Sequence, residues 1–381
     1  MAEHKDQHYV PQVYLRQFSP DPEHRSLNMI RIPTMDVVPS VALKGQCQEN
    51  HFYGKDLKLE KALGELEGHF GDLLRKFDNK EFFPANQNPE RVHLLSHTMI
   101  QWARTKVSAT RTADAAKLPY EIAFKDYLRK KAPEIPKDVV DRMGFVPQNP
   151  AAPAAISVGQ GAMNTIFLTD LGLKVMIAPR GAAFITSDNP VVMTNPLFLG
   201  KWNGCVTGLN ARGLVILFPV SPTSLVVLFD SLIYKIGPAS KRIFEAQQND
   251  INYANCLQYL NADKAVYFQD SAGAPSLVAS FKKVHGLRRD QLTRTKRFGP
   301  VATPRGTEEI IHQFNEDIRY APPVSFLKPR DNVRHIPFGY RNELLRRLHA
   351  EFQEAVERGA FGPNQFAEFM EIDAKKLGIP I

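Results

Sequence analysis

The sequence predicts an α+β fold: a helical N-terminal part with two long antiparallel helices, packed on a mixed or antiparallel sheet of short strands, and a C-terminal helical extension. Two observations support this class. Residues 56–77 repeat leucine and phenylalanine every three or four positions, which places them on one face of a helix. After Gly161 the chain turns into short apolar runs interrupted by glycine, proline and asparagine, as expected for strands and turns.

The order of elements follows from these patterns. Pro89 begins a second long helix that we expect to continue to about Lys117, because proline suits the first helical turn. Shorter helices are expected at 120–131 and 136–143, followed by a joint rich in proline and alanine at 147–155. The expected strands are 27–33, 173–178, 183–186, 191–194, 214–219, 225–229 and 265–269, with a helix at 246–260.

Three parts are expected along the 381 residues. A core covers 5–285, helical over about 5–150 and rich in strands over about 160–270. A basic linker or arm, with few large apolar residues and little periodicity, covers 286–339. The C-terminal helical extension, 340–381, contains helices at about 340–358 and 363–377.

The net charge of +8 is concentrated in one segment. Between positions 282 and 305 only Asp290 opposes eight basic residues, which gives this segment a net charge of +7. Such a cluster indicates contact with nucleic acid or another polyanion. The alternative is a solvated linker whose charges only keep it soluble. The eight basic residues are Lys282, Lys283, Arg288, Arg289, Arg294, Lys296, Arg297 and Arg305.

Other motifs exclude several classes of protein. The three cysteines are far apart, so neither a disulfide framework nor a thiolate zinc site is expected, and a reducing cytoplasm fits. No apolar run approaches the roughly 18 residues of a membrane span, and the first residues lack the apolar core of a signal peptide. A Rossmann cofactor site, a P-loop and an α/β-hydrolase elbow are disfavoured because their glycine motifs are missing.

The second long helix has an unusual polar face. His93, His97, Gln101 and Arg104 share one side of it, opposite an apolar stripe, and a solvated face would normally carry lysine and glutamate. These polar groups need partners if they are covered. Glu60 and Glu67 lie seven residues apart on one side of the first helix and could supply them. Gly64 and Gly71 fall on the same side and suggest the close approach of another segment.

We call the polar face of the second helix, together with Glu60 and Glu67 of the first, the polar centre. Two interpretations of it remain open. In the first, a buried ion pair between a glutamate and Arg104 joins the two helices. In the second, Glu60, Glu67, a histidine of the second helix and His8 converge on a metal or a phosphate. His93 and His97 have the i, i+4 spacing of metal ligands but lack the general-base glutamate of HExxH. The candidate metal ligands are Glu60, Glu67 and His97, with Mg²⁺ or Mn²⁺ as the ion.

Two shorter motifs complete the candidate site. Tyr9, Tyr14 and Phe18 recur within QHYVPQVYLRQF, so we expect them to be buried, with His8 directed toward Glu60 or Glu67. In ITSDNPVV, Asp188 sits between two apolar runs. It either forms a turn with its own backbone or projects a carboxylate into a cleft at the end of a strand.

The chain resembles the bacterial domain-of-unknown-function family 4238 over about residues 5–270. The motifs that carry the resemblance are HYVPQVYLRQF, the NHFY run at 50–53, Glu60 and Glu67, QxxRT at 101–105, ITSDNPVV and FPVSP. Lys106 stands where the family usually has proline. The resemblance implies a prokaryotic origin and a site at which His8, Glu60, Glu67, Gln101, Arg104 and Asp188 meet. It implies no activity.

Two hypotheses about function follow. The first is a metal-dependent, nuclease-like hydrolase in which His8, Glu60, Glu67 and Asp188 are catalytic and the basic segment holds phosphates. The second is a non-enzymatic binding or sensor protein for a small anionic ligand or nucleic acid, with a structural polar centre. Its candidate binding residues are Arg16, Gln101, Arg104, Arg288, Arg289, Lys296 and Arg297, since arginine suits bidentate recognition of phosphate or carboxylate.

Overall fold

The chain has an α+β fold, as predicted. The computed structural model describes residues 5–86, 88–145, 148–202, 204–290, 292–303, 306–333, 335–362, 365 and 369. Within these residues, no helix has both the length and the apolar character needed to cross a membrane. The helices are α1 (Gln12–Leu15), α2 (Lys58–Lys76), α3 (Pro89–Ala103), α4 (Lys106–Lys131), α5 (Lys137–Arg142), α6 (Ala152–Asn164), α7 (Gln248–Asn261), α8 (Ala274–Val284) and α9 (Glu343–Glu357).

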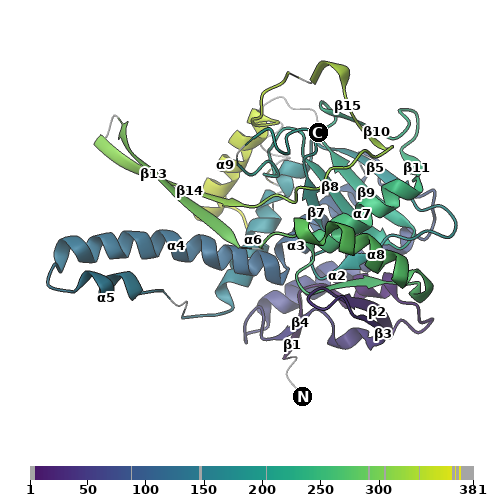
Figure 1. Cartoon of the computed structure of the whole chain (residues 1–381), viewed down its shortest axis with the longest axis horizontal. Coiled ribbons are helices and arrows are strands. Elements are labelled where there is room, and N and C mark those ends of the chain that lie inside the picture. The colour runs from purple at the N-terminus through teal and green to yellow at the C-terminus, as the bar shows by residue number, and fades with distance from the viewer. Residues whose placement is uncertain are drawn as a thin grey trace.

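Two sheets form the centre of the molecule (Figure 1). The five-stranded sheet has the order β11 (Ile243–Glu245), β5 (Gly172–Ile177), β9 (Ser224–Phe229), β8 (Val215–Ser221), β7 (Val192–Thr194). The four-stranded sheet has the order β3 (Val37–Ala42), β2 (Ser26–Arg31), β12 (Ala265–Phe268), β6 (Thr186–Ser187). Only β11 and β5 pair in parallel within these two sheets. Every position of β8 and β9 is buried, so these strands form the middle of the core.

Tyr14 links the two sheets. Its hydroxyl lies 2.7 Å from Oγ1 of Thr186 on β6 and donates to the carbonyl of Pro219 on β8 at 2.6 Å. Its fully buried ring stacks against Phe70 of α2 and Phe218. Phe18 is also fully buried and Tyr9 is half-buried. The N-terminal motif therefore packs into the core, as its aromatic spacing predicts.

Helices α2 and α3 run antiparallel. The end of α2 meets the start of α3 through Lys76 and Glu90, and the middle of α2 meets the end of α3 through Glu67 and Arg104. The predicted close approach is confirmed at Gly71, where a Cβ atom would lie 2.9 Å from a methyl group of Val13. It is wrong at Gly64, where a Cβ atom would meet no other atom within 4 Å.

The single helix expected over 89–117 is in fact two. Helix α3 ends at Ala103, and α4 begins at Lys106 after an extended Thr105, whose hydroxyl accepts from the Ser108 amide at 3.3 Å. This threonine cap ends one helix and starts the next in a new direction. Helix α4 then includes the short helix expected at 120–131. Of the joint expected at 147–155, only residues 152–155 belong to α6, whose Gly161 allows close contact with Ala103.

The basic linker or arm expected over 286–339 is not irregular throughout. Strands β13 (Thr293–Thr303) and β14 (Gly306–Asn315) pair antiparallel from Thr293–Asn315 to Thr303–Gly306. We call residues 292–315 the ribbon and residues 106–145, which contain α4 and α5, the helical prong. Both project from the same side of the body (Figure 1).

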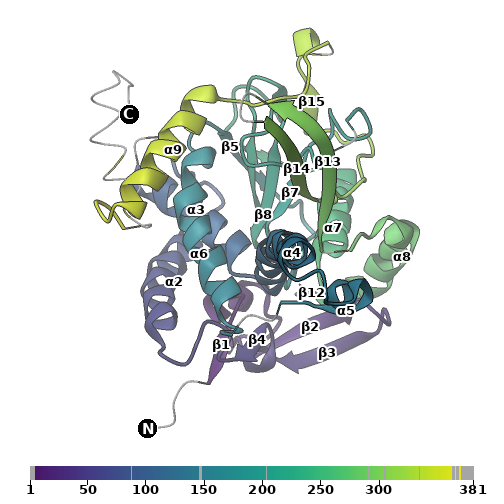
Figure 2. The ribbon, with the colours of Figure 1, turned by 90° about the vertical axis from the view of Figure 1, so that its left-hand side faces the viewer.

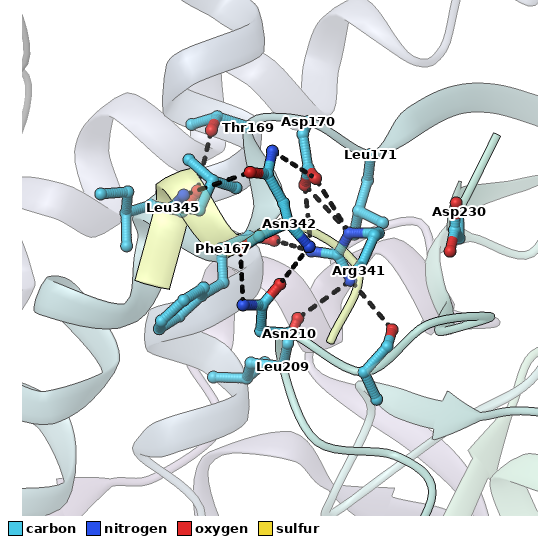
Figure 3. A network of polar contacts seen from close by, with 12 residues as sticks. Phe167, Thr169, Asp170, Leu171, Leu209, Asn210, Asp230, Arg341, Asn342 and Leu345 are labelled. Atoms are coloured by element: carbon cyan, nitrogen blue, oxygen red, sulfur yellow. Dashed lines mark hydrogen bonds and ion pairs between the residues drawn. The ribbon is translucent and has the colours of Figure 1, made fainter. Parts of the chain in front are cut away.

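The residues that follow the ribbon, including the C-terminal extension, pack on the core. Strand β15 (Leu327–Pro329) pairs with β10 (Tyr234–Ile236). The Arg341 side chain, only 2% exposed, forms an ion pair with Asp170 and donates to the carbonyls of Phe167, Leu209 and Ala211 (Figure 3). Helix α9 agrees with the helix expected at 340–358. The helix expected at 363–377 falls almost entirely outside the described residues.

Candidate functional site

Arg104 is the centre of the polar site that the sequence predicts. It follows the last turn of α3, and its side chain is 3% exposed. One guanidinium nitrogen, Nη2, donates to the carbonyl of His8 at 2.6 Å and lies 2.8 Å from Glu67 Oε1. The Nε atom donates to the hydroxyl of Tyr53 at 3.2 Å. A buried guanidinium thus holds α2, α3 and the N-terminal motif together.

Gln7 and His8 complete this arrangement. The side-chain amide of Gln7 accepts from the backbone N–H of Tyr53 at 2.6 Å and donates to the carbonyl of Gly54 at 2.9 Å. The His8 ring contacts the carbonyl of Lys44 at 3.0 Å and the amide nitrogen of Gln12 at 3.2 Å. Burial lowers the pKa of His8, which favours the neutral ring. The contacts of His8 and Arg104 are therefore those of a structural junction.

Glu60 and Gln101 border the same centre. The pKa of Tyr53 is raised to about 12, mainly by burial of the phenol. Glu60 is close enough to Tyr53 for its negative charge to contribute to this rise. Gln101 donates to the carbonyl of Tyr9 at 3.4 Å. The arginine's ion-pair partner is Glu67, so the structure distinguishes between the two glutamates that the sequence offers.

His97 has an apolar environment. Its ring stacks on Phe70 with 4.5 Å between centroids, and burial lowers the pKa of His97 to about 3. His93 stacks instead with His69 at 5.9 Å. Among the described residues, no group of three or more His, Cys, Asp or Glu side chains is arranged to hold a metal ion. The proposed set of Glu60, Glu67 and His97 does not form such a group.

Asp188 belongs to a separate network. Its carboxylate accepts from the backbone amides of Asp263, Lys264 and Ala265 at 2.8, 2.7 and 3.1 Å. Burial outweighs these bonds and raises the pKa of Asp188 to about 6. The neighbouring Asn189 exchanges hydrogen bonds with Asn261 at the end of α7. The TSDNP run therefore joins β6 to α7 and β12. The carboxylate bonds a distant backbone segment and not its own, so the expectation that Asp188 forms a turn with its own backbone is wrong.

Of the predicted polar set, the structure brings together His8, Glu67, Gln101 and Arg104, with Glu60 at the border. Arg16 is exposed on the surface. The sequence interpretation missed Gln7 and Tyr53. Both residues stood within the motifs NHFY and QHYVPQ, but neither shows a periodicity that would indicate a hydrogen bond between segments 46 residues apart.

The predicted binding arginines differ in their surroundings. Arg288 donates to the carbonyls of Tyr259 and Ala262, the latter at 2.7 Å, and so caps the C-terminal end of α7. Arg289 lies 3.8 Å from Glu316. Arg294 contacts Asp290 at 2.8 Å and Glu316 at 3.3 Å. Lys296 and Arg297 lie on β13, opposite His312 and Ile311 in the strand register.

The ribbon and the helical prong are joined at their common root. Thr293 donates to the carbonyl of Arg111 at 3.2 Å, and Gln313 donates to that of Ala115 at 2.9 Å. Between them a pocket of about 460 Å³ is lined by Trp102, Ile156, Phe314 and others. Figure 2 looks onto the ends of the two projections and shows β13 and β14 beside α4. These contacts fix the ribbon against the helix at its base.

The two projections, together with the segment 282–291 that leads into the ribbon, account for the whole net charge of the chain. The helical prong contains nine basic and six acidic residues, a net charge of +3. Residues 282–315, which contain the ribbon and the segment before it, have eight basic and three acidic residues, a net charge of +5. Because the total is also +8, the remainder of the chain is balanced.

The helical prong also carries exposed aromatic side chains. Tyr120 and Tyr127 are 68% and 59% exposed, and Phe124 and Phe145 of the same prong are partly exposed.

Comparison with known protein families identifies the family of this chain. The family model described as "Protein of unknown function (DUF4238)" matches residues 6–272, more than half of the chain. No curated protein and no solved structure matches. The matched region begins at the N-terminal motif and ends shortly after β12, so α8, the ribbon and α9 follow it. The chain therefore belongs to the DUF4238 family.

Proposed function

We propose that this protein binds nucleic acid through the helical prong and the ribbon. The observation that carries the proposal is the charge distribution: the net charge of +8 resides in these two projections and the segment that leads into the ribbon. A polyanion is attracted by such a concentration of charge, and the balanced body does not compete with it.

The shapes of the two projections support the same partner. A two-stranded antiparallel ribbon has the dimensions that fit the major groove of duplex DNA. The exposed tyrosines of the helical prong can stack on unpaired bases, which is how many proteins hold single strands. The hydrogen bonds at the root hold both projections in a fixed relation before any ligand arrives. Little conformational entropy would then be lost on binding.

The proposal is one of binding, without a hydrolytic step. A hydrolase built on Glu60, Glu67 and His97 would need these side chains to converge on an ion. In the structure Glu67 contacts Arg104, His97 stacks on Phe70, and Asp188 accepts three backbone amides elsewhere. These contacts support a structural role for the polar centre, and the charge distribution supports binding at the basic surface.

The test is the salt dependence of binding. Fluorescence anisotropy would follow a labelled duplex of about 20 base pairs, and single-stranded DNA and RNA of the same sequence, from about 50 to 200 mM salt. Each phosphate neutralised contributes a slope of about −0.9 for duplex and about −0.7 for single strands in log K against log salt. The preferred probe distinguishes groove binding by the ribbon from base stacking on the helical prong.

A matched pair of variants locates the surface. The test variant replaces Lys130, Lys131, Lys296 and Arg297 by Gln. The control replaces Lys55, Lys58, Lys61 and Lys80, exposed residues of α2 and its flanks, and so removes the same charge elsewhere. We expect the slope to become shallower in the test variant and to remain unchanged in the control. Equal losses in both variants would remove the projections from the proposal, and the absence of wild-type binding to all three probes at about 50 mM salt would refute it.

A further inference from the structure

A second candidate binding site lies on the body, at the edge of the five-stranded sheet. A pocket of about 630 Å³ is lined by Phe83, Arg91, Thr169, Asp170, Ser231 and Arg242, among others. Arg91 comes from the first turn of α3, and Arg242 directly precedes the edge strand β11. The loop between α2 and α3 contributes Phe83. The volume is in the range typical of pockets for small molecules.

The only acidic residue in the described lining is already neutralised. Both carboxylate oxygens of Asp170 accept from Arg341, at 3.0 to 3.1 Å, and Oδ2 also accepts from Asn342 at 3.2 Å (Figure 3). Arg341 itself is not among the residues that line the pocket. The carboxylate therefore has no spare charge to offset the two arginines that remain in the lining.

Those two arginines have no carboxylate partner within the part of the chain that the structure describes. Arg91 donates one hydrogen bond, to the carbonyl of Leu171 at 2.8 Å, and a guanidinium has five N–H donors. Arg242 lies over the Phe83 ring, 5.4 Å from its centroid, which leaves its N–H edge unused. Burial lowers the pKa of Arg91, as expected for a guanidinium that has lost solvent without gaining an anion.

We propose that this pocket binds a small anionic metabolite through a phosphate or carboxylate group held by Arg91 and Arg242. The guanidinium fork matches the oxygens of both groups in a bidentate geometry. The hydroxyl of Ser231 supplies a further donor in the lining, whereas that of Thr169 already donates to the carbonyl of Ile166 at 2.8 Å. The site is distinct from the projecting basic surface and does not depend on nucleic-acid binding.

Isothermal titration of the full-length protein with three probes tests the site. Inorganic phosphate, AMP and citrate separate the possible ligands: the first two carry phosphate, and citrate carries only carboxylates. We expect at least one probe to bind. A preference for AMP over inorganic phosphate would identify a phosphorylated organic ligand, whereas a preference for citrate would identify a polycarboxylate.

Three variants make the result specific. Arg242→Ala removes a side chain whose described contact is the Phe83 ring, so the fold should persist, and its melting temperature would confirm this. Arg91→Lys keeps the charge but loses the fork. Both should weaken binding about tenfold or more, since a hydrogen bond to a charged group contributes about 1.5–3 kcal/mol and 1.4 kcal/mol is tenfold. Arg180→Ala removes an exposed charge beyond the other end of β5 and is the matched control.

The proposal would be overturned by either of two results. One is a failure of the wild-type protein to bind any of the three probes at millimolar concentrations. The other is an affinity that is the same in wild type and a folded Arg242→Ala variant, or that falls equally in Arg180→Ala.

Discussion

At the scale of single residues, the pair of Arg104 and Glu67 should determine much of the stability of the N-terminal half. Arg104→Ala leaves the carbonyl of His8 and the Glu67 carboxylate without their partner. We expect the free energy of unfolding to fall by about 3–5 kcal/mol, the usual cost of breaking a buried pair. Glu67→Ala should cost less, because the Glu67 side chain is 29% exposed.

A double-mutant cycle in denaturant melts would check this coupling. The double variant should be more stable than the sum of the single effects implies, by about 0.5–3 kcal/mol. Glu65→Ala, at an exposed position of the same helix, is the control and should change little. Strict additivity of the Arg104 and Glu67 effects would mean that the ion pair contributes nothing.

Two buried titratable residues should make opposite contributions to the pH dependence of stability. The pKa of Asp188 is about 6 in the fold against an ordinary value of 3.8, so the folded state binds more protons between these pH values. Its contribution to stability therefore falls as pH rises from about 4 to 6, by about 3 kcal/mol in total. The pKa of His97 is about 3 against 6.5, so the unfolded state binds more protons there, and its contribution rises with pH.

Denaturant melts of two variants between pH 4 and 6.5 would separate the contributions of Asp188 and His97 to stability. Relative to wild type, Asp188→Asn should gain stability as pH rises, and His97→Phe should lose it. Each replacement also shifts stability by an amount that does not depend on pH, so the informative quantity is the slope. Parallel pH profiles for wild type and Asp188→Asn would show that this carboxyl titrates normally.

The sequence predicts the members of the polar centre better than their pairing. A glutamate partner for Arg104 could be proposed because a helix face without lysine or glutamate must be covered, but the sequence did not decide between Glu60 and Glu67, and the structure shows Glu67. The roles of His97 and Asp188 could not be derived. Both roles depend on contacts with residues that are distant in the sequence. His97 stacks on Phe70, and Asp188 accepts from the three backbone amides of 263–265. No local pattern contains that information.

At the scale of elements, Arg288 should act as a helix cap, although it lies in the segment expected to be a free arm. Its guanidinium neutralises the carbonyls at the end of α7, where a positive charge is also favoured by the helix dipole. Arg288→Gln should lower the free energy of unfolding by about 1–3 kcal/mol. Lys282→Gln, at an exposed position of α8, should have almost no effect and is the control in the same denaturant melts.

The helices and strands of the core were largely predictable, and the ribbon was not. Helix α2 shows a clear apolar period, and the strands of the five-stranded sheet are short apolar runs. The ribbon shows neither signal in its sequence, although it forms a two-stranded antiparallel pair. Its threonines alternate with basic residues over 293–297, a pattern that also fits a solvated linker. The break between α3 and α4 depends on the helix cap at Thr105. It could not be predicted because the helical pattern of the sequence continues through this position.

At the scale of the whole molecule, the junction of Arg341 and Asp170 should make the C-terminal extension necessary for stability. Arg341→Ala leaves a partly buried carboxylate and three carbonyls without their donor. We expect a loss of about 3–5 kcal/mol in the free energy of unfolding, measured by denaturant melts. Arg346→Ala, whose side chain is 52% exposed on α9, should change stability by no more than about 0.5 kcal/mol. An Arg341→Ala variant as stable as wild type would show that this junction contributes little to stability.

The junction of Arg341 and Asp170 can form only late during synthesis of the chain. Asp170 and Arg341 are 171 residues apart in the chain. At about 5–20 residues per second, the ribosome adds Arg341 roughly 10–30 s after Asp170. Until then the carboxylate has neither its guanidinium nor the amide of Asn342, and the carbonyls of Phe167, Leu209 and Ala211 lack the same donor. The junction can therefore close only after Arg341 has been translated, and a chain stalled before that point would present an incomplete fold to chaperones and proteases.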